Sequence, residues 1–84
     1  MASSVSLQRI VHTPGIVGGR ARVEGTRVPV WILTHWSREG WSIARLGREY
    51  PSLTHDDIEA ALEYARMHPE EIDRDLADQD EDDD

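Results

Sequence analysis

Nine basic residues carry the most distinctive chemistry of this 84-residue chain, and all nine are arginine. The stretch GGRARVEGTRVPVW, residues 18–31, holds Arg20, Arg22 and Arg27 among glycines. Positions 20 and 22 fall on one face of an alternating strand, and Arg27 follows across a turn. Clustered guanidinium groups bind phosphate, so this hairpin is a candidate DNA-binding element. The same spacing also fits a structural role, in which Arg22 or Arg27 ties Glu24, a helix C-terminus or a carbonyl group.

A second pair of arginines, Arg45 and Arg48, lies three residues apart and shares one face of an expected helix. The pair is a further DNA-binding candidate, and an ordinary solvated helix face explains it equally well. The helix expected next, residues 54–67, opens with Asp56 and Asp57, which would repel phosphate. These carboxylates fit the positive end of the helix dipole instead. Any DNA contact is therefore expected from the arginines rather than from the start of that helix.

The spacing of histidine, serine and glycine offers no catalytic or metal-binding motif. The four histidines never stand four residues apart, and no cysteine is present to complete a metal site. Ser37, Ser42 and Ser52 fall at expected helix ends or turns, where serine caps the backbone. The glycines match no phosphate-loop or dinucleotide pattern. We therefore expect no enzymatic activity, no cofactor and no metal.

A β-rich N-terminal segment, residues 7–30, is the first element that would position the arginines. Thr13-Pro14-Gly15-Ile16 suits a type II turn, with proline and then glycine at its centre. Residues 20–23 and 27–30 are expected to pair around Glu24-Gly25, where glycine supplies the positive φ of a tight turn. The residues expected to shape this β-arm are Gly18, Gly19, Gly25, Thr26 and Pro29.

Three short capped helices are predicted after this β-arm. The first ends near Gly40, and the second is capped by Ser42 and ends before Pro51. The third opens with a capping box formed by Thr54 and Asp57. The spacing of its apolar residues follows one helix face: Ile58, Ala61, Leu62 and Ala65.

Three tryptophans stand five residues apart in the helical region. Trp36 fits the apolar stripe of the first helix, and Trp41 can pack on Leu46 as a hydrophobic staple. Trp31 fits neither pattern and, if exposed, is a candidate interface anchor.

Charge is divided unevenly along the chain, whose net charge is −8. Residues 1–50 hold seven arginines and three glutamates, whereas residues 51–84 hold two arginines and fourteen acids. Such asymmetry suggests two different partners, or one partner and a solubilising tail. The small size, the absence of cysteine, and the absence of a signal peptide or a long apolar segment predict a cytoplasmic protein that associates with itself or a partner.

The C-terminal end is the most acidic part, with six acids among residues 78–84. Residues 77–84 are expected to be disordered, as are residues 1–6. Before the tail, Ile72 and Leu76 lie four apart and fit one or two amphipathic turns. The tail either aids solubility or mimics nucleic acid in the basic cleft of a partner protein. In the second case, the candidate contact residues are Ile72, Leu76, Asp73, Asp75 and Asp78.

The chain resembles the domain-of-unknown-function family 433 (DUF433), whose members are often described as antitoxins of the VapB type. The resemblance covers roughly residues 9–72, and its most specific part is Gly-Thr-Arg-Val-Pro-Val followed later by Tyr-Pro-x-Leu. Ala21 departs from the pattern, since members commonly carry proline there, and the acidic tail lies outside it. The matching residues are Pro14-Gly15, Gly18-Gly19, Arg22, Gly25-Thr26-Arg27, Pro29, Gly40, Tyr50-Pro51, Leu53, Ile58, Ala61-Leu62 and Tyr64.

The resemblance implies a homeodomain-like helical fold, a cognate PIN-type ribonuclease toxin as partner, and operator DNA as a second partner. We accordingly predict a mainly α protein with small β content. Its single domain, residues 7–76, comprises a β-arm over residues 7–30 and a three-helix, helix-turn-helix-like bundle over residues 30–76. The leading hypothesis is an antitoxin-like homodimer or a hetero-oligomer with the toxin. The alternatives are a stand-alone DNA-binding regulator and a small assembly module without enzymatic activity.

Overall fold

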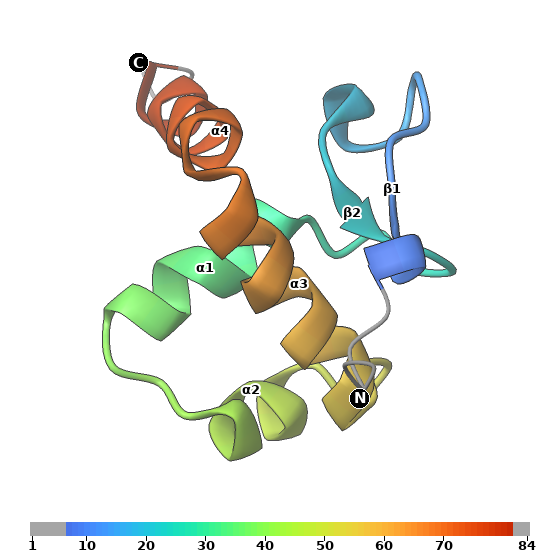
Figure 1. The fold of residues 1–84 in the computed structure, drawn as a ribbon, viewed down its shortest axis with the longest axis vertical. Helices are drawn as coiled ribbons and strands as arrows, with labels where there is room; N and C mark the ends of the chain where they lie inside the picture. The colour runs from blue at the N-terminus through green and yellow to red at the C-terminus, as the bar shows by residue number, and fades with distance from the viewer. Residues whose placement is uncertain (1–6, 82–84) are drawn as a thin grey trace.

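A computed structural model describes residues 7–81 and shows a mainly helical fold with one small β-hairpin, as predicted (Figure 1). Two antiparallel strands form the hairpin, and two short 3-10 turns lie next to them, at residues 7–9 and 17–19. The elements are β1 (Ile10–Val11), β2 (Arg22–Val23), α1 (Val30–Arg38), α2 (Ile43–Glu49), α3 (His55–Met67) and α4 (Pro69–Glu81).

The hairpin pairs different segments from those expected. Ile10 lies opposite Val23 in the antiparallel ladder, whereas residues 27–30 contribute only an isolated bridge from Pro29 to Arg22. The predicted turn at residues 13–16 is confirmed. The Ile16 amide donates to the Thr13 carbonyl oxygen at 3.0 Å, and Gly15 has the positive φ of 86° that a type II turn requires.

The helix boundaries follow local capping chemistry, and the predicted caps are confirmed. Helix α1 ends just before Gly40, whose φ of 100° suits glycine. The Ser42 hydroxyl accepts a hydrogen bond from the Arg45 amide at 3.1 Å at the start of α2. At the start of α3, the Asp57 amide donates to the Thr54 hydroxyl at 3.0 Å, and the Thr54 amide donates to the Asp57 carboxylate at 2.9 Å.

Helix α3 runs through the middle of the fold and packs against the other three helices and the hairpin (Figure 1). Every one of these elements places at least one fully buried side chain in the shared core, which makes the hairpin part of the domain rather than an appended arm. The largest such side chains are Val23, Val30, Leu33, Leu46, Ile58 and Ile72.

Helix α4 is the main departure from the sequence prediction. It continues for 13 residues to Glu81, where the sequence predicted one or two turns and disorder from residue 77. Ile72 is fully buried and Leu76 packs against the core, so α4 gains the tertiary contacts that a short helix needs in water. Glu70 and Glu71 also lie in its first turn, where carboxylates are favoured. Residues 1–6 and 82–84, also expected to be disordered, lie outside the described residues.

None of the helices in the described part of the chain is both long enough and apolar enough to cross a bilayer.

The capping box of α3 gives a first prediction about stability. Asp57 also accepts a hydrogen bond from Arg9 at 2.7 Å, so this carboxylate joins α3 to the start of the hairpin. We expect Asp57→Ala to lower the free energy of unfolding by about 1–2 kcal/mol, because a capping residue and an ion pair are lost together. Asp56→Ala, an exposed change one residue earlier, should alter it by less than about 0.5 kcal/mol. Urea unfolding measures both, and equal effects would contradict the role given to the box.

Candidate protein-binding groove

The hairpin arginines predicted to bind DNA do not form one outward patch. Arg20 reaches α4, where its guanidinium lies 3.1 Å from Asp78 and 3.6 Å from Asp75. Arg22 is buried and donates to the Thr26 carbonyl oxygen at 2.8 Å and to the Thr13 hydroxyl at 3.0 Å. The phosphate-binding role expected of Arg20 and Arg22 therefore does not fit the folded chain, because both guanidinium groups are directed into the fold, where the Nε atom of each is buried without a hydrogen-bond partner. For Arg22, the alternative of tying a carbonyl group fits.

The remaining three candidates are exposed but lie apart. Arg27 follows the tight turn after β2, and Arg45 and Arg48 lie on α2. The Arg45 guanidinium carbon lies 3.8 Å from the centre of the Trp41 ring. Only the α2 pair thus forms a local basic surface of the kind that the sequence suggested.

Gly18 shows why the glycines of the β-arm matter. Its φ is 70°, and a Cβ atom added there would clash with the Arg20 guanidinium. Glycine therefore permits both the turn and the path of Arg20 toward α4. In the next turn, the Thr26 hydroxyl donates to the Val23 carbonyl oxygen at 2.8 Å and accepts from the Val28 amide at 3.1 Å.

The residues of α4 expected to contact a toxin are mostly occupied within the fold. Ile72 is fully buried, and Leu76 is half-buried against the core. Asp75 and Asp78 face Arg20, while Asp73 forms an exposed 3.0 Å ion pair with Arg38 of α1. This corrects the sequence hypothesis, because a docked α4 cannot offer Ile72 or Asp75 to a partner.

The pKa values of two acidic groups in α4 shift in opposite directions. Burial would raise the pKa of Glu71, but hydrogen bonds from His12 at 2.7 Å and from the Tyr64 hydroxyl at 2.6 Å bring this pKa below its usual value. Burial raises the pKa of Asp75, and nearby Arg20 offsets this only in part. One Asp75 oxygen, Oδ2, is buried without a hydrogen-bond partner, which explains the difference. Burial and the Glu71 carboxylate together raise the pKa of Tyr64.

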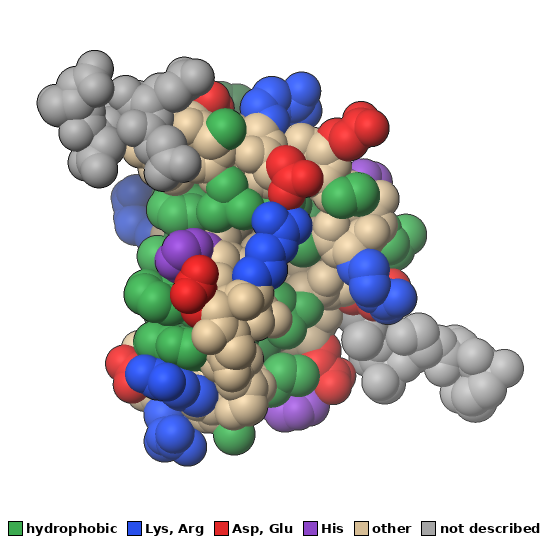
Figure 2. All heavy atoms as spheres, turned by 90° about the vertical axis from the view of Figure 1, so that its left-hand side faces the viewer, with side chains coloured by type: hydrophobic (Ala, Val, Ile, Leu, Met, Phe, Trp, Pro, Cys, Tyr) green, Lys and Arg blue, Asp and Glu red, His purple; other side chains and the backbone are tan. Residues whose placement is uncertain are grey.

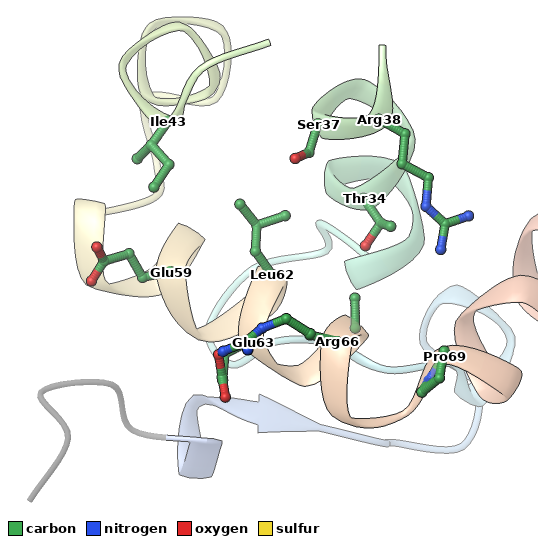
Figure 3. A pocket seen from close by; sticks show the side chains of 10 residues that line it. Thr34, Ser37, Arg38, Ile43, Glu59, Leu62, Glu63, Arg66 and Pro69 are labelled. Atoms are coloured by element: carbon green, nitrogen blue, oxygen red, sulfur yellow. The ribbon is translucent and has the colours of Figure 1, made fainter. Parts of the chain in front are cut away.

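An open groove lies between α1 and α3, with a volume of about 590 Å³. In Figure 3, Leu62 points from α3 into the hollow, and Ile43 and Ser37 face it from α2 and α1. Pro69 at the start of α4 closes one end of the groove, which is therefore shaped by all four helices. Its lining residues are Thr34, Ser37, Arg38, Ile43, Glu59, Leu62, Glu63, Ala65, Arg66 and Pro69.

The charged groups at the rim of the groove are mostly paired inside the chain. Arg38 pairs with Asp73, and Glu63 pairs with Arg66 along α3. Glu59 instead faces only the imidazole of His55, at 3.8 Å. The groove thus combines an apolar floor with one carboxylate that a partner can neutralise, an arrangement that can bind an amphipathic segment.

The sequence pattern alone does not predict this groove. The apolar spacing predicts Leu62 as a core residue of α3, and it does not predict that the neighbouring residues Glu59, Glu63 and Arg66 form a surface. Their spacing of four and then three places them on one helix face, which was the available signal. The facing wall from α1 carries no such signal, because its position depends on tertiary packing.

A cluster of three side chains that could bind a metal ion lies at the start of α3: His55, Asp56 and Glu59. The spacing of the histidines alone does not predict it. The ligand atoms of the cluster lie within 4.8 Å of one another. His55 and Asp56 are exposed. Asp56 lies in the first turn of α3, where the helix dipole favours a carboxylate.

A family model described as "Protein of unknown function (DUF433)" matches residues 10–65, which span the hairpin and α1 to α3. The chain belongs to the DUF433 family. The match ends before α4, so the helix that carries Asp75 and Asp78 lies beyond the matched part of this DUF433 protein.

Two related proteins extend this comparison. The chain is similar to a DUF433 member of known crystal structure from Anabaena variabilis, with 43% identity and a TM-score of 0.77, over 82% of this chain and 68% of that one. It is 37% identical over 60 residues to the uncharacterized protein y4eO of Sinorhizobium fredii. That match covers 71% of this chain but only 27% of y4eO. The chain thus spans about a quarter of its curated relative, in which a DUF433-like region is one part of a longer protein.

The contrast between Glu71 and Asp75 predicts how stability depends on pH. Because its folded pKa is lowered, Glu71 stabilises the fold above its unfolded pKa of about 4.3, and this contribution is lost as pH falls through the folded value. We expect Glu71→Gln to lower the free energy of unfolding by about 0.5–1 kcal/mol at pH 7, limited by the exposure of His12, and by less near pH 3.

Asp75→Asn is the matched comparison. A raised folded pKa means that the contribution of Asp75 is full below its unfolded pKa and is lost as pH rises through the folded value. We therefore expect this variant to be as stable as the parent at pH 7 or more stable, since Arg20 keeps Asp78. Urea unfolding between pH 7 and pH 3 tests both variants. A loss at pH 7 larger than that of Glu71→Gln would contradict the assignment.

Proposed function

We propose that this DUF433 protein is a non-enzymatic protein-binding module of the antitoxin type, which holds a PIN-type ribonuclease through the groove between α1 and α3. The observation that carries the proposal is the groove itself, with Leu62 and Ile43 accessible at its floor. Helix-in-groove binding uses this combination of an apolar floor and polar rim. A cytoplasmic location, expected from the sequence, belongs to the same proposal.

The rim charges favour a basic amphipathic segment as the bound part of the partner. Glu59 is the groove carboxylate that faces no arginine among the described residues, and the chain as a whole has a net charge of −8. A partner helix with an arginine or lysine beside its apolar face would neutralise Glu59 and cover Leu62. Such complementarity chiefly accelerates association and fixes the orientation of the two proteins.

In this proposal the ribonuclease contacts the helices next to α4, whereas the sequence predicted a contact with α4 itself. Helix α4 closes one end of the groove through Pro69 and contributes Ile72 to the core. Removal of residues 69–84 would therefore unfold part of the domain, and its effect on inhibition would not report a direct contact. Point substitutions in the groove provide the sharper test.

The longer relative supports a binding role over catalysis. A region similar to this chain occupies 27% of y4eO, as expected for a module that is joined to different partners. Hetero-oligomer formation with a ribonuclease is the assembly that we propose, with a homodimer as the form of the free protein.

Operator binding is a second candidate function, supported by the exposure of Arg27, Arg45 and Arg48. It would rely on α2 and the hairpin turn rather than on α3. The exposed Asp56 and the half-buried Glu59 give the start of α3 the wrong charge for a DNA groove. A steep fall of duplex affinity with salt, sensitive to Arg27, would support this candidate.

The groove is tested by titration calorimetry with the PIN-type ribonuclease that the proposal expects to be encoded next to this chain. We expect Glu59→Arg to weaken binding about tenfold, because it replaces the complementary charge at the rim by a like charge.

Glu49→Arg is the matched control, since it makes the same charge change at an exposed site on α2 outside the groove. It should change the dissociation constant less than about twofold. Equal weakening by both variants would show that only net charge matters, and the absence of any complex with the parent chain would contradict the antitoxin proposal.

A further inference from the structure

A continuous stack of flat side chains lies at the corner between α1 and α2. The rings of Trp36 and Trp41 are stacked, with centres 4.5 Å apart and planes inclined by 21°. The Arg45 guanidinium covers Trp41 at 3.8 Å from the ring centre, and His35 meets Trp36 edge-on at 4.7 Å. Arg45 is therefore the outermost layer of a stack that begins on α1.

The outer layer of this stack is open to a ligand. Arg45 is exposed, and its guanidinium carbon lies over the Trp41 ring, so the side chain contacts both the indole and solvent. Across residues 7–81, neither Arg45 nor Arg48 forms an ion pair, whereas Arg9, Arg20, Arg38 and Arg66 each do. The indole thus holds a flat cation in place without neutralising its charge.

The corner also lies far from the acidic end of the chain. Figure 1 shows α2 and the end of α4 at opposite ends of the long axis of the molecule, which extends 43 Å. Exposed charges further apart than the Debye length, about 8 Å at physiological salt, are largely screened from one another, so the acids near the end of α4 act weakly on Arg45. In Figure 2, basic side chains gather beside hydrophobic ones at the α2 end, while acidic groups are scattered over the same face.

We propose that this corner binds single-stranded nucleic acid. A base stacks on the free face of Arg45 and extends the Trp36–Trp41 stack, and the adjoining phosphate contacts Arg48, which lies one turn further along α2. Guanidinium planes and aromatic rings are the surfaces on which unpaired bases stack. A duplex is disfavoured, because its bases are already stacked on one another and its phosphates would approach the acidic start of α3. This site is separate from the groove, and neither proposal depends on the other.

The test uses fluorescence anisotropy of a labelled single-stranded oligouridine of about 12 nucleotides at low salt. Arg45→Lys keeps the charge and removes the plane, and it should weaken binding about tenfold, the loss of roughly one base-stacking contact. Arg74→Lys, at an exposed arginine on α4, is the matched control and should change affinity less than twofold. Both positions are exposed, so both variants should melt at the temperature of the parent.

Competition then separates base stacking from simple charge attraction. Polyphosphate, which has no bases, should displace the oligonucleotide weakly from the parent chain, and a duplex of equal length should bind more weakly than the single strand. Equal affinities of Arg45→Lys and Arg74→Lys, preferential binding of the duplex, or no binding by the parent at low salt would each overturn the proposal.

Discussion

The attachment of the N-terminal hairpin to the last two helices is the constraint on which the rest of this structure depends. Arg9 pairs with Asp57 of α3, His12 with Glu71 of α4, and Arg20 with Asp78 of α4, across 48, 59 and 58 residues of chain. The last two contacts hold α4 against the hairpin, and the start of α4 in turn closes one end of the groove. Arg20 of the basic N-terminal part therefore pairs with Asp78 of the acidic C-terminal part, and these two charges already have partners within the chain.

This pairing changes what the charge asymmetry of the sequence means. A basic front and an acidic end suggested two separate partners, one for each sign. In the folded chain, Arg20 and Arg22 serve the fold, and Asp75 and Asp78 face Arg20. Two outward surfaces stand out among the described residues: a groove in which Glu59 faces no arginine, and an exposed arginine next to two stacked tryptophans. Side chains from more than one helix form each surface, and no run of charged residues in the sequence marks either of them.

Local chemistry made much of the fold predictable. The Ser42 cap, the Thr54–Asp57 box and the stop at Gly40 each depend on a few consecutive residues, and the structure confirms all three. The extent of α4 was not predictable, because its acidic composition indicates disorder while its stability comes from Ile72 and from a distant arginine. The groove was missed for the same reason, since only its α3 wall has a pattern in the sequence. The DUF433 family model matches residues 10–65, and α4 lies beyond the matched part.

Native-state hydrogen exchange of the α4 backbone tests the central claim most directly, namely that the acidic end is a docked helix held by the hairpin. The amides between Ile72 and Asp78 should exchange far more slowly than those of an unfolded peptide in the parent chain. In Arg20→Ala they should lose much of that protection while those of α3 keep theirs. Exchange of the α4 amides at unprotected rates in the parent chain, or equal protection in both proteins, would contradict this account.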